Sequence, residues 1–251
     1  MKRKSIVYAA VAALLLAGCN GGTELKTDFY EAEATEAVAE GALDSIRVSV
    51  SLEYPVGGTT KEALDHMTRL IIGKGMDSED TDIAKAVDAY IQTTVANYRE
   101  TNAELYEEMG EEAADQLAWV DELRGFFSDR YKDIATYTLK TYTESGGPHG
   151  DNDIYYMNLN VTDGNLVTEK DLFKEGYEAK LNTLLTSHLR EALPDEESYE
   201  SLFVKDIEAN GNFRVSPEGL YYIYVAYEIG PYYLGAIEVM VPWSELEDIL
   251  A

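Results

Sequence analysis

The stretch "DSIRVSVSLEYP" (residues 44–55) alternates apolar and polar side chains. Successive side chains of a β-strand point to opposite faces, so the alternation predicts a strand with one face in a core and the other in water. Such strands are typical of antiparallel sheets that are covered on one face only. The apolar set comprises Ile46, Val48, Val50, Leu52 and Tyr54.

Two amphipathic helices are expected after this strand. Thr59 or Thr60 can cap the first, and Gly73 is expected to stop it. Residues 80–109 predict a longer helix. Its tyrosines could stack on a ligand, but aromatic residues at helical spacing are more typical of a core, so we expect a packing face. The apolar residues of the two faces are Leu64, Met67, Leu70 and Ile71, then Ile83, Val87, Tyr90, Ile91, Thr94, Val95 and Tyr98.

The second half of the chain predicts further strands around one long helix. Residues 131–145 are rich in Thr and Tyr and favour a strand that ends at Gly146. Asp163 and Gly164 predict a hairpin between residues 155–161 and 166–168. A leucine-rich helix over residues 177–192 is followed by three strands, at residues 213–215, 220–227 and 237–242. Ser244 and Glu247 predict a capping box for a short helix over residues 243–250.

The order of these elements predicts the α+β class, with antiparallel sheets, helices packed on one face, and two consecutive small α/β subdomains. Residues 1–18 are interpreted as a signal sequence and residues 19–43 as a flexible tether. The N-terminal domain is expected over residues 44–145 and the C-terminal domain over residues 146–251.

The first residues favour export and lipidation. Lys2, Arg3 and Lys4 precede an apolar stretch that ends in Leu-Ala-Gly before Cys19, the single cysteine of the chain. This pattern is similar to a bacterial lipobox, in which the cysteine carries the lipid. We therefore expect a lipoprotein of the cell envelope, anchored to a membrane and either periplasmic or surface-exposed, rather than a cytoplasmic protein.

The formal net charge of −27 makes the chain strongly acidic, and removal of the basic first residues makes it more so. Such a charge opposes binding to nucleic acid and to anionic lipid surfaces, and it favours cationic partners. The alternative is an acidic surface that serves only to keep the protein soluble. Composition alone does not distinguish such a surface from one whose charge attracts a basic ligand.

Catalytic and cofactor motifs give no firm assignment. Gly73 and Gly75 lack the third glycine of a dinucleotide fingerprint, and no Walker or G-x-S-x-G sequence occurs. The three histidines, His66, His149 and His188, lack zinc-ligand spacing, and His188 lies in an apolar helical face. The sequence Asp151-Asn152-Asp153 begins like a calcium loop but continues with tyrosines. We predict no metal and no cofactor.

His149 lies in "GGPHG" (residues 146–150), where the glycines and Pro148 account for a sharp turn. We therefore expect His149 to be structural, and no catalytic residue is predicted.

Four segments, "GGPHG", "DGNLVTEKDLF", "GLYYIYVAYEIGPYYLG" and "IEVMVPWSEL", occur in this order. Together they resemble the extracytoplasmic domain family of RsiV-type anti-sigma factors, which bind lysozyme; the family also occurs beside PdaC-type deacetylase domains. The resemblance covers residues 146–250 and implies a recognition module for lysozyme or a cell-wall glycan. The sequence contains neither an anti-sigma segment nor the metal-binding motifs of a deacetylase. The resemblance therefore does not by itself imply signalling or deacetylation. A glycan hydrolase and a passive structural lipoprotein are the alternatives.

The stretch "YEIGPYYLG" (residues 227–235) is the expected ligand-binding loop. Gly230 and Pro231 shape its backbone, while Tyr232 and Tyr233 place two large rings where a hairpin loop is ordinarily polar. We expect Pro231, Tyr232 and Tyr233 to contact the ligand, although a ring folded back onto the core is the alternative for each tyrosine.

Overall fold

The computed structural model describes residues 24–43 and 45–251. The expected signal sequence, Cys19 and the beginning of the expected tether lie outside the described residues. Within the described ranges, no helix has both the length and the apolar character needed to cross a membrane. The chain divides into two compact units, one formed by Leu25–Phe126 with Lys140–Asn152 and the other by Phe127–Leu139 with Asp153–Ala251. The expected boundary at residues 145 and 146 differs from this interleaved division.

Strand β1 (Lys26–Ala37) pairs antiparallel with β2 (Ser45–Gly57) along its whole length. The expectation of a flexible tether over residues 19–43 is therefore wrong for this segment. The core-facing positions of β1 include Ala32 and Ala34, which are buried. Because alanine contributes little apolar surface, the alternation that marks a strand is weak in this part of the sequence.

Strand β2 confirms the alternating pattern, since Ile46, Val48, Val50 and Leu52 are at most 2% exposed. On its other side β2 pairs parallel with β3 (Trp119–Tyr131). The parallel pairing follows from the long helical connection between the two strands, which returns the chain to the same end of the sheet.

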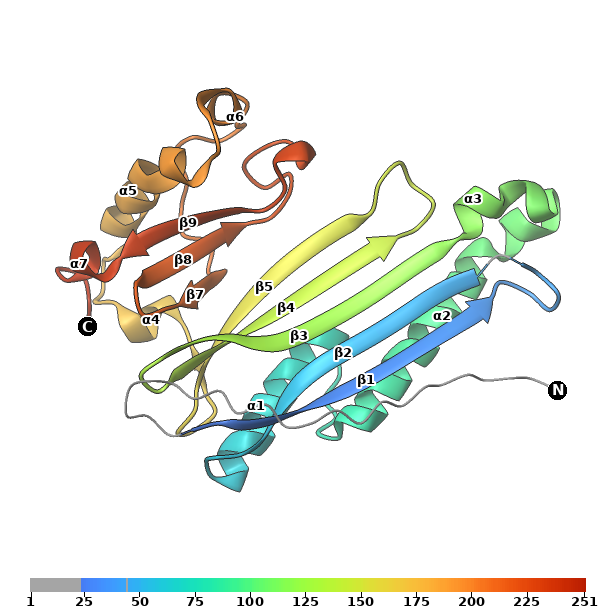
Figure 1. The fold of residues 1–251 in the computed structure, drawn as a ribbon, viewed down its shortest axis with the longest axis horizontal. Coiled ribbons are helices and arrows are strands. Elements are labelled where there is room, and N and C mark those ends of the chain that lie inside the picture. Colours follow the sequence, from blue (N-terminus) through green and yellow to red (C-terminus); the bar gives the residue numbers. More distant parts are fainter. Residues whose placement is uncertain (1–23, 44) are drawn as a thin grey trace. The chain divides into compact units, whose positions relative to one another are not determined.

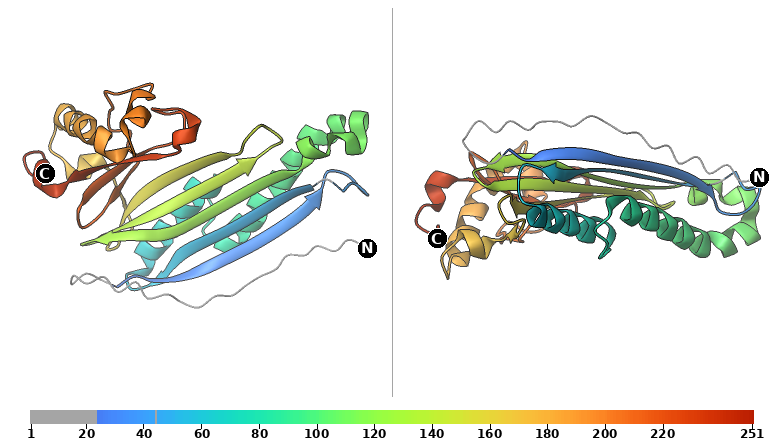
Figure 2. Two further views of the ribbon diagram at one scale, coloured as in Figure 1. Left: turned by 45° about the horizontal axis from the view of Figure 1, so that its top comes forward. Right: turned by 90° about the horizontal axis from the view of Figure 1, so that it is seen from below.

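Helices α1 (Lys61–Met76) and α2 (Ile83–Met109) cover one face of the sheet in the first unit (Figure 1, Figure 2). Thr60 is the N-cap of α1, and its Oγ1 accepts a hydrogen bond from the backbone N–H of Ala63. The expected end of α1 at Gly73 is wrong. The helix continues to Met76. It ends at Asp77, which has a left-handed backbone conformation and donates its backbone N–H to the Gly73 carbonyl.

The core-facing side of α2 packs as predicted. Val87 and Tyr98 are fully buried, and Val95 is 7% exposed. The hydroxyl of Tyr98 donates to the Leu117 carbonyl at 2.8 Å, so this ring belongs to the core of the first unit. The short helices η1 (Gly110–Ala113) and α3 (Ala114–Leu117) then lead into β3.

Strands β3, β4 (Ile134–Glu144) and β5 (Asp151–Asn160) each contribute residues to both units, within a sheet of order β1-β2-β3-β4-β5-β6. Strand β6 (Leu166–Val167) pairs antiparallel with β5. The turn between them contains Gly164 with φ 77°, which confirms the expected hairpin. Helix α4 (Glu169–Leu172) follows, with Thr168 and Asp171 forming a capping box.

A second sheet, of antiparallel order β7-β8-β9, lies in the second unit and confirms the three expected strands. It consists of β7 (Phe213–Val215), β8 (Gly219–Tyr224) and β9 (Ile237–Pro242). The helical segments around it are α5 (Glu178–His188), η2 (Leu189–Ala192), α6 (Glu196–Glu200), η3 (Tyr232–Leu234) and α7 (Trp243–Leu246). The α+β class is thus confirmed, and β2 with β3 is a parallel pair within it.

The expected capping box of Ser244 and Glu247 is wrong. Helix α7 begins directly after Pro242, ends at Leu246 and has no side-chain cap. Trp243 fixes its start instead, because the indole Nε1 donates to the Ser216 carbonyl at 2.9 Å.

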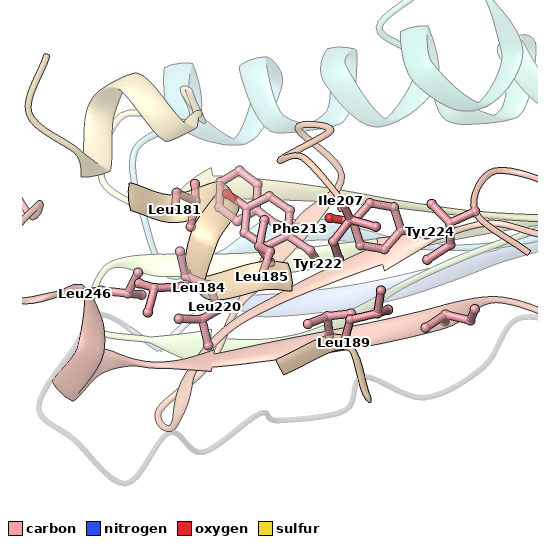
Figure 3. Close-up of a cluster of buried hydrophobic side chains, with 14 of the residues drawn as sticks. Leu181, Leu184, Leu185, Leu189, Ile207, Phe213, Leu220, Tyr222, Tyr224 and Leu246 are labelled. Atoms are coloured by element: carbon pink, nitrogen blue, oxygen red, sulfur yellow. The ribbon is translucent and has the colours of Figure 1, made fainter. Parts of the chain in front are cut away.

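The core of the second unit lies between α5 and the second sheet. Leu181 and Leu185 of α5 and Leu189 of η2 belong to one buried cluster with Leu220 and Tyr222 of β8 (Figure 3). All five side chains are fully buried. At about 25 cal/mol per Å² of buried apolar surface, each such leucine contributes about 2 kcal/mol, so this interface holds the sheet and the helix together.

Side-chain amides fix strand β7 beside β5 in the second unit. The Asn158 Nδ2 donates to the Phe213 carbonyl at 2.8 Å, and its Oδ1 accepts from the Val215 N–H at 3.1 Å. Asn212 donates in the same way to the Ile154 carbonyl and accepts from the Tyr156 N–H, both at 2.8 Å. These bonds replace part of a backbone ladder and satisfy buried polar groups.

Candidate functional site

The loop from β8 to β9 presents two exposed tyrosine rings. Tyr227 is 55% exposed and Tyr233 is 70% exposed, whereas Tyr232 is half-buried and its ring lies 5.6 Å from that of Tyr227. Pro231 is half-buried and precedes η3, whose short turn is closed by the hydrogen bond from the Leu234 N–H to the Pro231 carbonyl. The ring of Tyr233 therefore lies in solvent, and the ring of Tyr232 packs beside that of Tyr227.

A second exposed segment lies beside this loop and follows α6. Phe203 is 63% exposed and Val204 is 41% exposed. The backbone N–H groups of both residues donate to the Ile229 carbonyl, at 2.9 and 3.2 Å. We call Phe203, Val204, Tyr227, Tyr232 and Tyr233 the aromatic patch. Phe203 and Val204 were not expected from the sequence, where the only signal is the short apolar run Leu202-Phe203-Val204 between acidic residues.

The backbone beneath the aromatic patch is tightly held. Ile229 is 4% exposed, and a Cβ atom at Gly230 would lie 2.9 Å from Leu202 Cδ2, so only glycine fits this position without a shift. Glu228 accepts hydrogen bonds from the Val225 N–H at 2.9 Å and from the Asn210 side chain at 2.8 Å. The exposed rings are thus carried by a fixed loop, which lowers the entropy cost of binding.

The charges around the aromatic patch are mainly negative. Asp206, Glu208 and Glu228 are exposed on the same two segments, while the one lysine there, Lys205, pairs with Glu200. An aromatic surface with an acidic rim is suited to a partner that is apolar at its centre and basic at its edge.

Buried tyrosines underlie the loop along β8. The Tyr224 hydroxyl donates to the Glu208 carbonyl at 2.8 Å, and burial together with the charge of Glu228 raises the pKa of Tyr224. The Tyr222 and Tyr177 hydroxyls donate to the two carboxylate oxygens of Glu169 at 2.9 Å each. Burial and this carboxylate raise the pKa of Tyr177 to about 12 and that of Tyr222 further.

These raised pKa values predict a loss of stability at alkaline pH. Because the folded protein keeps phenol protons that the unfolded chain releases, this stabilisation is complete below the ordinary tyrosine pKa of about 10 and is lost as the pH rises through about 12. Denaturant unfolding between about pH 9 and pH 12 measures the loss. The variant Tyr177→Phe should lose stability less steeply over this range, and an unchanged slope would contradict the assignment.

The other residues that the sequence singled out do not join the aromatic patch. His149 is exposed in the turn before β5, where its Nδ1 lies 3.3 Å from the Gly150 carbonyl, and its structural role stays a prediction. Asp151 and Asp153 belong to β5. The His188 Nε2 lies 3.1 Å from Glu245 Oε2. In the part of the chain that the structure describes, no three His, Cys, Asp or Glu side chains gather as a metal site.

The chain is thus an α+β protein whose aromatic patch is exposed on two segments that are joined by backbone hydrogen bonds. Residues 170–244, which include the whole aromatic patch, match the family model of DUF3298, a protein family of unknown function. No curated protein matches the chain.

Two crystal structures of DUF3298 family proteins share the fold. One, from Bacteroides fragilis, has a TM-score of 0.81 and 21% sequence identity, over 90% of this chain and 94% of that chain. The other, from Pseudomonas aeruginosa PAO1, has a TM-score of 0.60 and 13% identity, over 100% of this chain and 95% of that chain. At these identities the likeness establishes the fold.

Proposed function

We propose that this protein is a lipid-anchored binding protein of the bacterial cell envelope and that its aromatic patch binds a basic protein of the lysozyme class. The observation that carries the proposal is the pair of exposed rings, Tyr233 and Phe203, on two segments that are hydrogen-bonded to each other. Exposed aromatic side chains on a fixed backbone are typical of interface hot spots, where a few residues supply most of the binding energy.

The charge of the chain supports a basic partner. A net charge of −27 accelerates encounter with a cationic protein and slows encounter with an anionic one. The acids beside the aromatic patch, Asp206, Glu208 and Glu228, supply part of this charge at the place of contact. Association should therefore slow as salt is added, whereas dissociation should depend on the aromatic residues.

The class of partner comes from the resemblance to the sensor domain of RsiV-type anti-sigma factors, and the anchor comes from the lipobox-like position of Cys19. Labelling the chain with a fatty acid, with and without the change Cys19→Ala, tests the anchor. A single lipid chain binds membranes only marginally, so stable retention requires the multiple acylation that bacterial lipoproteins carry.

Replacing Phe203 and Tyr233 together by alanine should weaken lysozyme binding by at least about 2 kcal/mol, or about 30-fold in Kd, because both rings lose their contact area. Titration calorimetry of lysozyme into wild type and double variant measures the effect, with circular dichroism to verify folding. Val56→Ala is the matched control, since Val56 is 48% exposed in the first unit and should leave Kd unchanged.

Four results would each overturn part or all of the proposal. Absence of lysozyme binding by the wild type rejects the partner, and equal binding by the double variant rejects the aromatic patch. Binding of fragmented peptidoglycan in place of lysozyme favours the glycan alternative, and release of new reducing ends from that glycan identifies a hydrolase.

A further inference from the structure

A cavity of about 270 Å³ opens in the second unit, apart from the residues of the aromatic patch. Strands β5 and β6, the start of α4, and Gly211 before β7 contribute to its lining. Gly211 has φ 75°, and a Cβ atom built on it would meet no atom within 4 Å, so the cavity wall is open at this point. The volume lies near the lower end of the range for small-molecule sites, about 300–1,000 Å³, which limits an occupant to a small compound or a single side chain.

Glu169 is the one acidic residue among the described residues that line the cavity. Its Oε2 accepts from the Tyr177 hydroxyl and its Oε1 from the Tyr222 hydroxyl, at 2.9 Å each. Both phenols are neutral donors at physiological pH, since an ordinary tyrosine has a pKa of about 10 and burial raises the pKa of these two further. A carboxylate offers about four lone-pair positions, so two acceptor positions remain for a ligand.

The negative charge of Glu169 is not neutralised by its hydrogen-bond partners. Among the described residues, Glu169 makes no salt bridge with a lysine, arginine or histidine, although Lys170 also lines the cavity. A half-buried carboxylate without a counter-charge gains most from a ligand that brings a positive charge.

Aromatic rings form one part of the wall, beside the aliphatic Leu166 and Val167 and the polar Asn158, Thr168 and Lys170. Tyr155, Tyr156 and Phe213 line the cavity with Tyr177. The Tyr156 hydroxyl is engaged by Glu238 Oε1 at 2.9 Å, which fixes the orientation of the ring. The faces of aromatic rings attract cations, with the strongest effect where water is excluded, and they pack equally well against an apolar stem.

We propose that this cavity binds a small ligand with an ammonium group on an apolar stem, with Glu169 as its counter-charge and the tyrosine rings as its walls. An anion would meet both Glu169 and the net negative charge of the chain. A neutral sugar could use the free acceptor positions of Glu169 but would leave its charge uncompensated. The site is independent of the protein-binding function proposed for the aromatic patch.

Tyramine is the probe, because it combines a primary ammonium group with a ring on a short stem. Its neutral control is 4-ethylphenol, which lacks the ammonium group, and its anionic control is 3-(4-hydroxyphenyl)propionate. Titrations followed by two-dimensional NMR should give a Kd for tyramine at least about tenfold below that of 4-ethylphenol, with no binding of the propionate. The shifted resonances should include those of residues 155, 156 and 169.

The variant Glu169→Gln keeps an acceptor oxygen for one tyrosine hydroxyl, places an amide NH2 beside the other and removes the charge, and it should weaken tyramine binding at least about tenfold. Glu175→Gln, at an exposed position of the following loop, is the matched control and should bind as wild type does. If Glu169→Gln does not fold, Tyr155→Leu tests the aromatic wall and should also weaken binding.

Equal affinities for tyramine and 4-ethylphenol would overturn the proposal, as would unchanged tyramine binding by a folded Glu169→Gln. Binding of N-acetylglucosamine with no binding of tyramine would assign the cavity to a neutral saccharide instead. Because none of these titrations contains lysozyme, their outcome is separate from that of the aromatic patch.

Discussion

Replacing Arg214 by methionine should lower the free energy of unfolding by about 3 kcal/mol. The guanidinium donates from Nε and Nη2 to the two oxygens of Glu238, at 2.7 and 3.0 Å, and from Nη1 to Asp129 at 3.1 Å. It also lies 3.6 Å from the centre of the Tyr221 ring. Without it, Glu238 and Asp129, which are both half-buried, would lose the counter-charge that they share, and this costs more than the lost hydrogen bonds.

Thermal unfolding measures this loss, and a fall in Tm of about 6–12 °C is expected for a domain of this size. Arg214→Lys retains the charge but not the bidentate geometry, so its loss should be smaller. Adding Glu238→Gln to Arg214→Met removes one of the uncompensated charges and should recover part of the stability. A Tm of Arg214→Met within about 2 °C of wild type would show that solvent already compensates the two carboxylates.

The parts of the fold that the sequence predicts are those in which the apolar period is strong. In β2 every second side chain from Ile46 to Leu52 is buried, and in α5 Leu181 and Leu185 stand one helical turn apart on the buried face. In such segments, apolar residues that repeat every 2 residues indicate a strand, and those that repeat every 3.6 residues indicate a helix. Both patterns can be recognised without knowledge of distant contacts.

Strand β3 shows why other parts could not be predicted. Leu123 and Phe127 are buried, but Asp121 also takes an inner position, where the Tyr90 hydroxyl donates to its Oδ1 at 2.7 Å. Burial raises the pKa of Asp121, which indicates that this carboxylate is partly withdrawn from water. A charged side chain at such a position breaks the alternation, and its tyrosine partner lies 31 residues away in α2.

The candidate sites depend on the same kind of distant contact. The loop tyrosines could be predicted because two rings in a Gly-Pro turn are unusual on their own. Phe203 joins them only through backbone hydrogen bonds to Ile229, and Glu169 becomes a cavity carboxylate only through Tyr177 and Tyr222. These contacts span from 8 to 53 positions of sequence, and no local pattern encodes them.

Replacing Tyr222 by alanine should lower the free energy of unfolding by about 4 kcal/mol, one of the largest effects expected for a single residue of this chain. Tyr222 is fully buried, and its ring stacks on that of Phe213 with centroids 5.3 Å apart. The ring packs among the side chains of α5 (Figure 3). Its removal would leave a cavity between helix and sheet that the surrounding leucines can fill only in part.

Tyr222→Phe separates the ring from its hydroxyl. This variant keeps the packing and loses one hydrogen bond to Glu169, so its expected loss is about 1–2 kcal/mol. Denaturant unfolding of the two variants gives both values. If Tyr222→Phe loses as much stability as Tyr222→Ala, then the bond to Glu169 dominates rather than the packing of the ring. If Tyr222→Ala loses clearly more stability than Tyr222→Phe, the packing of the ring between β8 and α5 supplies most of what Tyr222 contributes to stability.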